Sequence, residues 1–365
     1  TSNGPITARA LITATGQLNR PAWPNLPGRD RFAGETFHSA RWDHDVDLTG
    51  KTVAVIGTGA SAIQFVPEIA KQAKQVLLFQ RSAPYVIPKP DRPYSATEQR
   101  LMARFPLLQK LDRARVYAQN EARVLGFTSL QGAMRFHEYL FKKHLRECVP
   151  DPDTRAKLTP DYPMGCKRIL ISNDYYQALT KYRIPVITGG VRAITADGVE
   201  DIDGEHHQAD VIIYGTGFQA TDFLAPMTIT GRRGQDLNQA WRDGAEAYLG
   251  ITVHGFPNLF MLYGPNTNLG HNSIIYMIES QIAYVVSALE TLERDGHRFV
   301  DVRPGVQDDF NRRLQARMRD TVWDQGCESW YKTASGKNTN NWPGFTFSYR
   351  QRTRHLDPED YELHP

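Results

Sequence analysis

The amino-acid sequence predicts an α/β fold: a Rossmann-like domain on a parallel sheet, a second α/β body that is only partly present, and a helical insertion. Three observations support this prediction. The 365 residues suffice for two domains of roughly 150 residues each. A strand–helix–strand pattern with a glycine-rich turn occupies residues 51–80. A long, charged stretch with helical periodicity follows at residues 95–148.

Composition limits the classes of function. The chain is 41% hydrophobic and 23% charged, which is ordinary for a globular protein, and its net charge of +3 indicates neither a nucleic-acid nor a membrane partner. We expect no membrane-spanning helix, because no run of about 18 uncharged apolar residues is present. The three cysteines lack a Cys-x-x-Cys pair, which argues against a disulfide framework or zinc knuckle and favours the cytosol. The histidines lack metal-ligand spacing, so we predict no metal.

The first 48 residues are expected to be a strand and a linker. The run "ARALITATG" ends in Thr15-Gly16, and the prolines that follow at 21, 24 and 27 do not fit inside regular elements. This stretch should therefore cross between two bodies. The chain begins without Met, directly before a strand-like run that needs a partner strand. We therefore expect that an N-terminal portion of the natural protein is absent.

A glycine-rich turn follows the first buried strand. In "VIGTGASA", Gly57, Gly59 and Ala62 form the pattern Gly-x-Gly-x-x-Ala between a strand and a helix. The first glycine permits a tight turn, the second lets the backbone approach a pyrophosphate, and the small third residue lets the helix pack on the strand. The helix N-terminus adds a positive dipole end for phosphates. We predict a dinucleotide site here; the alternative is a strand–helix turn without a ligand.

The residues at the end of the second buried strand indicate which dinucleotide binds. An NAD site usually has an acidic residue here, whereas this chain has Gln80-Arg81-Ser82. Arg81 would pair with a 2′-phosphate, and no carboxylate is present to repel one. NADP(H) is therefore favoured over NAD(H), although Arg81 also fits an ordinary surface arginine.

Beyond residue 95 the pattern first becomes helical and then alternates again. Ser95 and Glu98 form a capping box, and residues 95–148 carry ten Lys/Arg against five Asp/Glu. This excess fits a solvated helical insertion or a basic rim that attracts an anionic cofactor. Short strands are predicted between 184 and 217, a buried strand at 258–264, and the longest helix at 273–292.

These motifs together resemble the Baeyer–Villiger monooxygenases, which are class B flavin-dependent monooxygenases. "RFAGETFHSARWDH" fits the fingerprint Phe-x-Gly-x-x-x-His-x-x-x-Trp-Pro/Asp of that family, at Phe32, Gly34, His38, Trp42 and Asp43. "CKRILISNDYYQAL" and "DVIIYGTGF" match segments that close its NADP domain and return to its FAD domain. Related N- and S-oxidising flavin monooxygenases usually lack the final Trp-Pro/Asp.

The resemblance implies a flavoprotein with two dinucleotide-binding domains, in which NADPH reduces FAD and a flavin peroxide formed with dioxygen converts a ketone to an ester or lactone. It implies a FAD-domain strand and linker at 1–48, an NADP domain at 49–188 with the insertion at about 95–148, and the C-terminal part of the FAD domain at 189–365. The family's first Gly-rich turn, which binds FAD, has no match here. N- or S-oxygenation and a non-catalytic NADP-binding fragment therefore stay open as alternatives.

Individual site residues follow from the resemblance. Arg168 matches the catalytic arginine of the family. The predicted NADP contacts are Gly57, Thr58, Gly59, Ala60, Ser61, Ala62, Arg81, Ser82, Lys167 and Trp330. The predicted FAD-side residues are Thr15, Gly16, Gly215, Thr216, Gly217, Asn266 and Asn268. Asn266 and Asn268 fit turn formers equally well, and Trp330 fits a core residue almost as well.

The fingerprint itself is interpreted as a clamp in the linker. Gly34 would supply an unusual backbone angle, Phe32 and Trp42 would pack, and His38 would form a hydrogen bond across the junction. We expect it to couple the position of the NADPH domain to flavin chemistry. The substrate is expected to be a small-molecule ketone together with dioxygen, and the oligomeric state is open.

Overall fold

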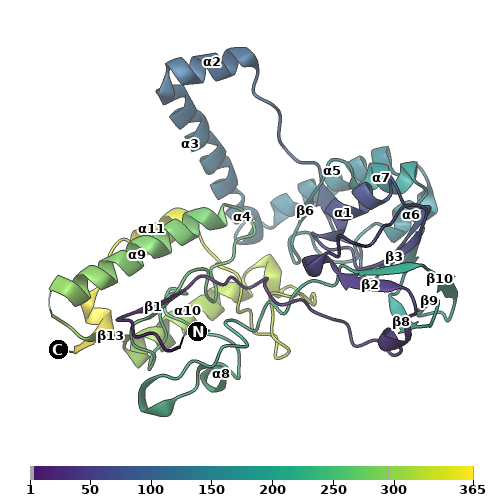
Figure 1. Cartoon of the computed structure of the whole chain (residues 1–365). Coiled ribbons are helices and arrows are strands. Elements are labelled where there is room, and N and C mark those ends of the chain that lie inside the picture. Colours follow the sequence, from purple (N-terminus) through teal and green to yellow (C-terminus); the bar gives the residue numbers. More distant parts are fainter. Residues whose placement is uncertain (1–3, 295, 365) are drawn as a thin grey trace. The chain divides into compact units, whose positions relative to one another are not determined.

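The computed structural model describes residues 4–294 and 296–364, which form two compact units. Unit 1 contains the residues up to Asn19, Tyr94–Gln131 and the residues from Ala220 on. Unit 2 contains Arg20–Pro93 and Gly132–Gln219 (Figure 1). None of the helices described in either unit combines the length and the apolar character needed to cross a lipid bilayer.

Unit 2 is built on a five-stranded parallel sheet. Its strand order is β2-β11-β3-β4-β7, so a strand from late in the chain lies between the first two. The strands are β2 (Glu35–His38), β3 (Thr52–Ile56), β4 (Gln75–Gln80), β7 (Val186–Thr188) and β11 (Val211–Tyr214). Parallel strands with apolar residues on both faces require a cover on each side of the sheet.

The two faces of this sheet have different covers. Val53 and Val55 of β3 belong to a core with the apolar residues of three helices, α1 (Ala62–Ile69), α5 (Gly132–Cys148) and α7 (Tyr175–Lys181). Ala54 and Ile56 face the opposite way and pack with residues of a three-stranded antiparallel sheet. That sheet contains β8 (Val191–Ile194), β9 (Gly198–Asp201) and β10 (His206–Gln208). The period of two along β3 therefore produces three layers.

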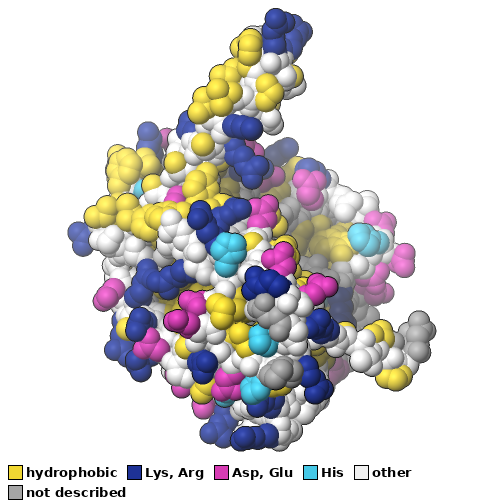
Figure 2. All heavy atoms as spheres, turned by 90° about the vertical axis from the view of Figure 1, so that its left-hand side faces the viewer, with side chains coloured by type: hydrophobic (Ala, Val, Ile, Leu, Met, Phe, Trp, Pro, Cys, Tyr) yellow, Lys and Arg dark blue, Asp and Glu magenta, His cyan; other side chains and the backbone are white. Residues whose placement is uncertain are grey.

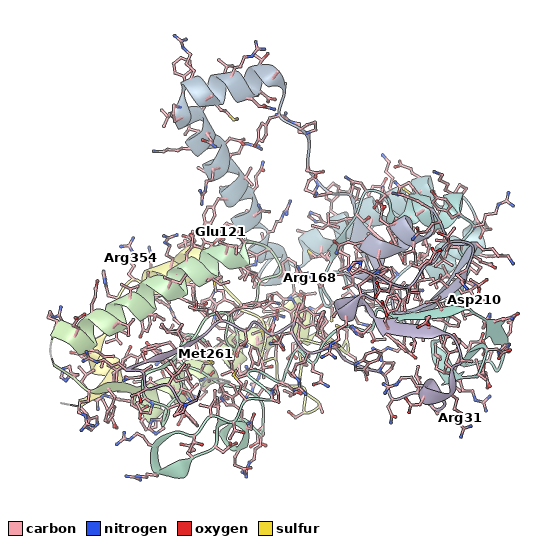
Figure 3. All side chains as sticks on the ribbon, viewed as in Figure 1. Arg31, Glu121, Arg168, Asp210, Met261 and Arg354 are labelled. Atoms are coloured by element: carbon pink, nitrogen blue, oxygen red, sulfur yellow. The ribbon has the colours of Figure 1, made fainter. Side chains whose placement is uncertain are left out.

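Unit 1 contains a short parallel strand pair and a long helix. β1 (Leu11–Thr13) pairs with β12 (Leu259–Met261), whose last residue is labelled in Figure 3. α9 (Ile274–Arg294) contributes Tyr284, Val285, Ala288 and Leu292 to a core shared with Phe260 of β12. β13 (Phe299–Val302) and β14 (Tyr361–His364) add an antiparallel pair, and α10 (Pro304–Arg319) and α11 (Thr346–Arg352) lie between them in the chain.

The remaining elements are short. Unit 2 also has a parallel pair of β5 (Val86–Ile87) with β6 (Leu170–Ile171), and helix α6 (Pro152–Lys157). Unit 1 also has α8 (Leu237–Ala240). Single 3-10 turns lie at Arg29–Arg31, Ser39–Arg41, Arg232–Gly234, Val322–Asp324 and Pro358–Asp360.

The predicted helical insertion is divided between the units. α2 (Ala96–Arg104), α3 (Pro106–Ala122) and α4 (Val124–Phe127) belong to unit 1, whereas α5 belongs to unit 2. The capping box of Ser95 and Glu98 begins α2, as predicted. Buried Glu121 attaches α3 to unit 1, because its carboxylate accepts hydrogen bonds from Asn272 Nδ2 (2.6 Å) and Thr346 Oγ1 (2.8 Å) (Figure 3). Apolar side chains lie along one side of the α2–α3 pair, with Lys and Arg at its end (Figure 2).

Two further differences concern the linker and the second half of the chain. Residues 35–38 form an edge strand of the main sheet, and residues 189–219 belong to unit 2 because β11 lies between β2 and β3. The unit bounds therefore differ from the domain bounds expected at 48 and 188. The expected unusual angle at Gly34 is wrong, since its φ is not positive. Gly34 instead permits a close approach: an added Cβ would lie 2.3 Å from the carbonyl oxygen of Asp210.

This approach generates a prediction. Gly34→Ala forces the Cβ against the Asp210 carbonyl and the Phe32 ring, so either the edge strand or its neighbour must shift. We expect a loss of about 1–3 kcal/mol in the free energy of unfolding, measured by urea denaturation. Gly132→Ala is the matched control, because no heavy atom lies within 4 Å of its added Cβ. Equal losses for both variants would contradict the steric explanation.

Candidate functional site

The predicted dinucleotide turn lies where β3 ends. Gly57 has a φ of 110°, and a Cβ there would lie 2.4 Å from the carbonyl oxygen of Gly215, so only glycine fits. The turn continues through Gly59 into α1, whose N-terminus presents the positive end of its dipole. This is the carboxyl edge of a parallel sheet, where ligands of open α/β folds bind.

Cationic and hydroxyl groups gather beside the turn. The hydroxyl of Thr58 donates to the carbonyl oxygen of Ser82 (3.4 Å), and Lys167 Nζ donates to the hydroxyl of Ser82 (3.2 Å). Lys167 also lies over the Tyr162 ring, 4.4 Å from its centroid. Arg81 is exposed at the end of β4 and has no ion pair within the described residues. The structure thus brings Thr58, Ser82 and Lys167 together next to an unneutralised arginine.

Gly215, Thr216 and Gly217 belong to unit 2, whereas Thr15 and Gly16 belong to unit 1. The amide of Gly215 donates to the carbonyl of Ile56 (2.8 Å), and Thr216 Oγ1 donates to the carbonyl of Ala22 (2.6 Å). The cause is the strand order, which places the carboxyl ends of β11 and β3 side by side. Their assignment to the FAD side stays a prediction.

His38 lies between two of the four segments where the chain passes between the units, those near residues 20 and 219. Trp23 and Phe218 pack on its fully buried ring, with centroid distances of 5.3 and 6.1 Å. Its Nδ1 accepts a hydrogen bond from the amide of Ala40 (3.1 Å), so the neutral ring carries its proton on Nε2. Burial lowers the pKa of His38 from its ordinary value, with the backbone of Gly217 acting in the opposite direction.

The other fingerprint residues pack on either side of the main sheet. Trp42 contacts the rings of Phe37 and Phe65, with centroid distances of 5.1 and 5.3 Å. Phe32 packs against the core on the opposite face. The side chain of Asp43 accepts a hydrogen bond from the amide of Asp45 (3.0 Å). Phe32 and Trp42 thus pack on opposite faces of the sheet, and their role in the linker stays a prediction.

In unit 1 a polar cluster lies where β1 and β12 end. Gln17 Nε2 donates to the Tyr263 hydroxyl (2.8 Å), which donates to Asn268 Oδ1 (2.9 Å). Gly16 has a φ of 66°, and its added Cβ would lie 3.9 Å from the Tyr263 ring. The segment 264–273 then leads into α9. Thr15, Gly16 and Asn268 are thus in one region of unit 1, at the carboxyl ends of two parallel strands.

A set of buried amides completes this region; we call it the amide cluster. Asn266 has a φ of 57°, which fits a turn former, and its Nδ2 donates to the carbonyl of Asn338 (2.8 Å). Asn268 Nδ2 donates to Asn341 Oδ1 (2.9 Å). Buried polar atoms without a partner among the described residues remain on Asn338 (Nδ2), Asn340 (Oδ1) and Asn341 (Nδ2). Such atoms are normally satisfied, so they point to a polar ligand or water.

The second half of the amide cluster and two neighbouring residues, Glu121 and His271, were not predicted from the sequence. The Asn-rich run "KNTNNW" was the available signal for the amides. Buried Glu121, described above, lies near His271, whose ring nitrogens have no partner in the described structure. Burial lowers the pKa of His271 to about 4, and Glu121 opposes this shift. His271 is therefore neutral at physiological pH.

Two predicted residues remain, Trp330 and Arg168. Trp330 is half-buried in unit 1, where its ring lies 4.4 Å from that of Tyr331, while the other predicted NADP contacts lie in unit 2. Arg168 is exposed in unit 2, directly before β6 (Figure 3). Their predicted roles remain untested by these positions.

One group of side chains has the spacing of metal ligands. Ligand atoms of Asp201, Glu205 and His207 lie within 4.8 Å of one another around the β9–β10 hairpin. The carboxylate of buried Asp201 already accepts the amides of Asp203 and Glu205, and His207 Nε2 lies 2.8 Å from it. These bonds close the hairpin, which explains the cluster without an ion.

Known proteins resemble nearly the whole chain. Residues 7–122 match the family model described as flavin-binding monooxygenase-like. A Baeyer–Villiger monooxygenase of Pseudomonas aeruginosa is 50% identical over 359 residues, covering 98% of this chain and 68% of the relative. One from Streptomyces coelicolor is 44% identical over 365 residues, covering 100% and 70%.

Solved structures of monooxygenases are also similar to nearly the whole chain. A steroid monooxygenase bound to NADP has a TM-score of 0.83 at 29% identity, covering 98% of this chain and 75% of its own. The OTEMO complex with FAD and NADP has a TM-score of 0.86 at 26% identity, covering 98% and 76%. The predicted fold class is confirmed. Identity of 50% over more than two thirds of the relative shows that this chain belongs to the Baeyer–Villiger monooxygenase family.

Proposed function

We propose that the protein is an NADPH- and FAD-dependent monooxygenase. It inserts one oxygen atom of dioxygen next to a ketone carbonyl, which gives an ester or lactone. The observation that carries this is the grouping of an NADP-type turn with Arg81, Ser82 and Lys167 in unit 2 of a family member. Related structures in complex with FAD and NADP support the same pair of cofactors.

In unit 2 the residues fit NADP(H). The Gly57 turn and the N-terminus of α1 would hold the pyrophosphate, because free amides and a positive dipole end favour negative charge. Arg81 and Lys167 would hold the 2′-phosphate, with Ser82 fixing the position of Lys167 through its hydroxyl. Since Arg81 has no carboxylate partner, a phosphate would not have to displace one.

In unit 1 the residues fit a polar ring system such as that of FAD. The unpartnered atoms of Asn338, Asn340 and Asn341 are buried and lie next to the strand ends where ligands of α/β folds bind. When bound, FAD takes the reducing equivalents of NADPH and is the place where dioxygen is activated. The chain's own contribution there is a buried set of amide donors and acceptors.

Arg168 is proposed as the catalytic residue. It directly follows Lys167 and has no ion pair within the described residues, so its charge is available to a ligand. A guanidinium stays protonated at any physiological pH, and it would stabilise negative charge that develops on oxygen during insertion. We propose a ketone as the substrate, and not a nitrogen or sulfur compound, on the evidence that the fingerprint ends in Trp42-Asp43. A cytosolic location remains a prediction from composition alone.

The phosphate contact predicts cofactor selectivity. Arg81→Ala should weaken NADPH binding by roughly 10–100-fold and NADH binding far less, because one charge-assisted contact to the 2′-phosphate is lost. Titration of both nucleotides by calorimetry measures this. Exposed Lys74→Ala, on the same unit, is the charge-matched control and should change neither affinity. Equal losses for NADPH and NADH in Arg81→Ala would contradict the assignment.

The catalytic assignment predicts a separation of two half-reactions. In FAD-loaded protein, Arg168→Ala should reduce ester formation by at least about 100-fold while NADPH still bleaches the flavin absorbance. Stopped-flow spectroscopy follows reduction, and product analysis follows oxygenation. Arg168→Lys keeps the charge but not the planar fork, so it should recover only part of the activity. Ester formation at the original rate in Arg168→Ala would exclude the proposed role.

The position of His38 predicts a loss of coupling. His38→Gln should lower the amount of ester formed per NADPH consumed by roughly threefold or more, because the segments of Trp23 and Phe218, which lead to unit 1, lose a shared contact. Exposed His44→Gln is the matched control in the same linker. Unchanged coupling and unchanged NADPH affinity in His38→Gln would show that the fingerprint histidine only fills space.

A further inference from the structure

A cleft in unit 1 is lined by residues that have no role in the proposed reaction. Its volume is about 430 Å³, which is within the range of small-molecule sites. Three arginines and three aromatic side chains dominate its lining: Arg313, Arg317, Arg352, Tyr248, Phe310 and Trp342. Arg317 and Arg352 belong to the last turns of α10 and α11, Arg313 lies earlier on α10, and the aromatic rings form apolar walls. We call it the arginine cleft.

Two of the arginines lack a carboxylate partner. Arg317 Nη2 donates to the carbonyl oxygen of Pro343 (2.9 Å), and neither Arg317 nor Arg352 has an ion pair within the described residues. Burial, and then the charge of Arg352, lower the pKa of Arg317. Both side chains are still exposed, and their like charges repel each other. A bound anion would remove this repulsion and accept planar hydrogen bonds from both.

The acidic residues of the lining are already engaged. Asp309 forms ion pairs with Arg312 and Arg313 on the surface of α10. The carboxylate of Asp360 accepts a hydrogen bond from the Tyr248 hydroxyl at 2.5 Å. Within the described residues neither carboxylate forms an ion pair with Arg317 or Arg352, so the positive charge of that pair stays uncompensated there. The cleft thus offers a cationic end and an apolar body.

The walls favour a flat ligand. The Tyr248 and Phe310 rings meet edge to face, with centroids 5.4 Å apart, and Trp342 is held by a hydrogen bond from its Nε1 to the carbonyl of Phe345 (3.3 Å). A Cβ on Gly344 would lie 3.1 Å from both Arg317 Nη2 and Trp342 Nε1, so glycine keeps these two groups close. Rigid aromatic walls next to a cation suit a ring that carries an acidic group.

We propose that the arginine cleft is a binding site for a small organic anion with a flat apolar body, whose carboxylate lies between Arg317 and Arg352. The site is separate from the proposed cofactor residues, none of which lines it. One contact leads from it to the amide cluster: the amide of Trp342 donates to the carbonyl of Asn268 (2.8 Å). An occupied cleft therefore holds the segment that also carries Asn338, Asn340 and Asn341.

The experiment uses benzoate as the probe on the full 365-residue chain. Isothermal calorimetry should give saturable binding, and Arg317→Gln and Arg352→Gln should each weaken it by about tenfold or more. Arg317→Lys should restore part of the affinity. Arg354→Gln is the matched control, since this exposed arginine follows α11 outside the lining and removes the same charge (Figure 3). The melting temperature of each variant reports whether it is folded.

Several outcomes would overturn the proposal. Absence of saturable benzoate binding by the unmodified chain would exclude the site. An equal loss in Arg354→Gln would show that only the general positive field attracts anions. Inorganic phosphate that competes as strongly as benzoate would show that the aromatic walls contribute nothing. Retained NADPH binding in Arg317→Gln keeps this test independent of the proposed reaction.

Discussion

The close approach of Gly57 and Gly215 is the constraint on which the nucleotide side of the molecule depends. A side chain at residue 57 would put its Cβ 2.4 Å from the Gly215 carbonyl, and the positive φ of 110° already disfavours any other residue. The approach lets β11 pair directly with β3, and that pairing in turn holds β2 as an edge strand. The same strand ends lead into α1 and into the segments around His38. The turn that would hold a pyrophosphate and the segments around His38 therefore depend on one backbone contact.

The two proposed cofactor regions differ in the interactions that they offer a ligand. In unit 2, charge and dipole act at an open edge: Arg81 is exposed and Lys167 is only partly buried. In unit 1, the amide cluster is almost fully buried and contains no net charge. Exposed cations recognise a phosphate at little desolvation cost, whereas buried amides fix a planar ring but are costly when left unpaired. Because unpaired buried amides are costly, the unsatisfied atoms of Asn338, Asn340 and Asn341 point to a polar ligand or water at this place.

Much of the local structure could be predicted because it is encoded locally. Apolar periodicity gave β3, α1, β4 and α9, and the capping box of Ser95 and Glu98 began α2. Non-local features were not visible. Residues 35–38 become a strand only because β11 supplies partners more than 170 positions later, and α3 joins unit 1 through one buried carboxylate, Glu121. The NADP-type residues share short motifs and could be named, while the amide cluster joins segments some 70 residues apart, which no single motif contains.

The interleaving of the two units has a consequence for how such a chain can be altered. The backbone leaves unit 2 after Pro93 and returns to it at Gly132. The segment with α2, α3 and α4 is therefore an excursion into unit 1 that unit 2 flanks on both sides. A recombination breakpoint in this excursion would divide both units between two parents, because each unit has residues on either side of it. Exchange of 94–131 as one cassette would keep unit 2 whole, but it would also exchange the carboxylate that Asn272 and Thr346 share. Viable chimaeras should therefore inherit 94–131 and the residues from Ala220 on from the same parent.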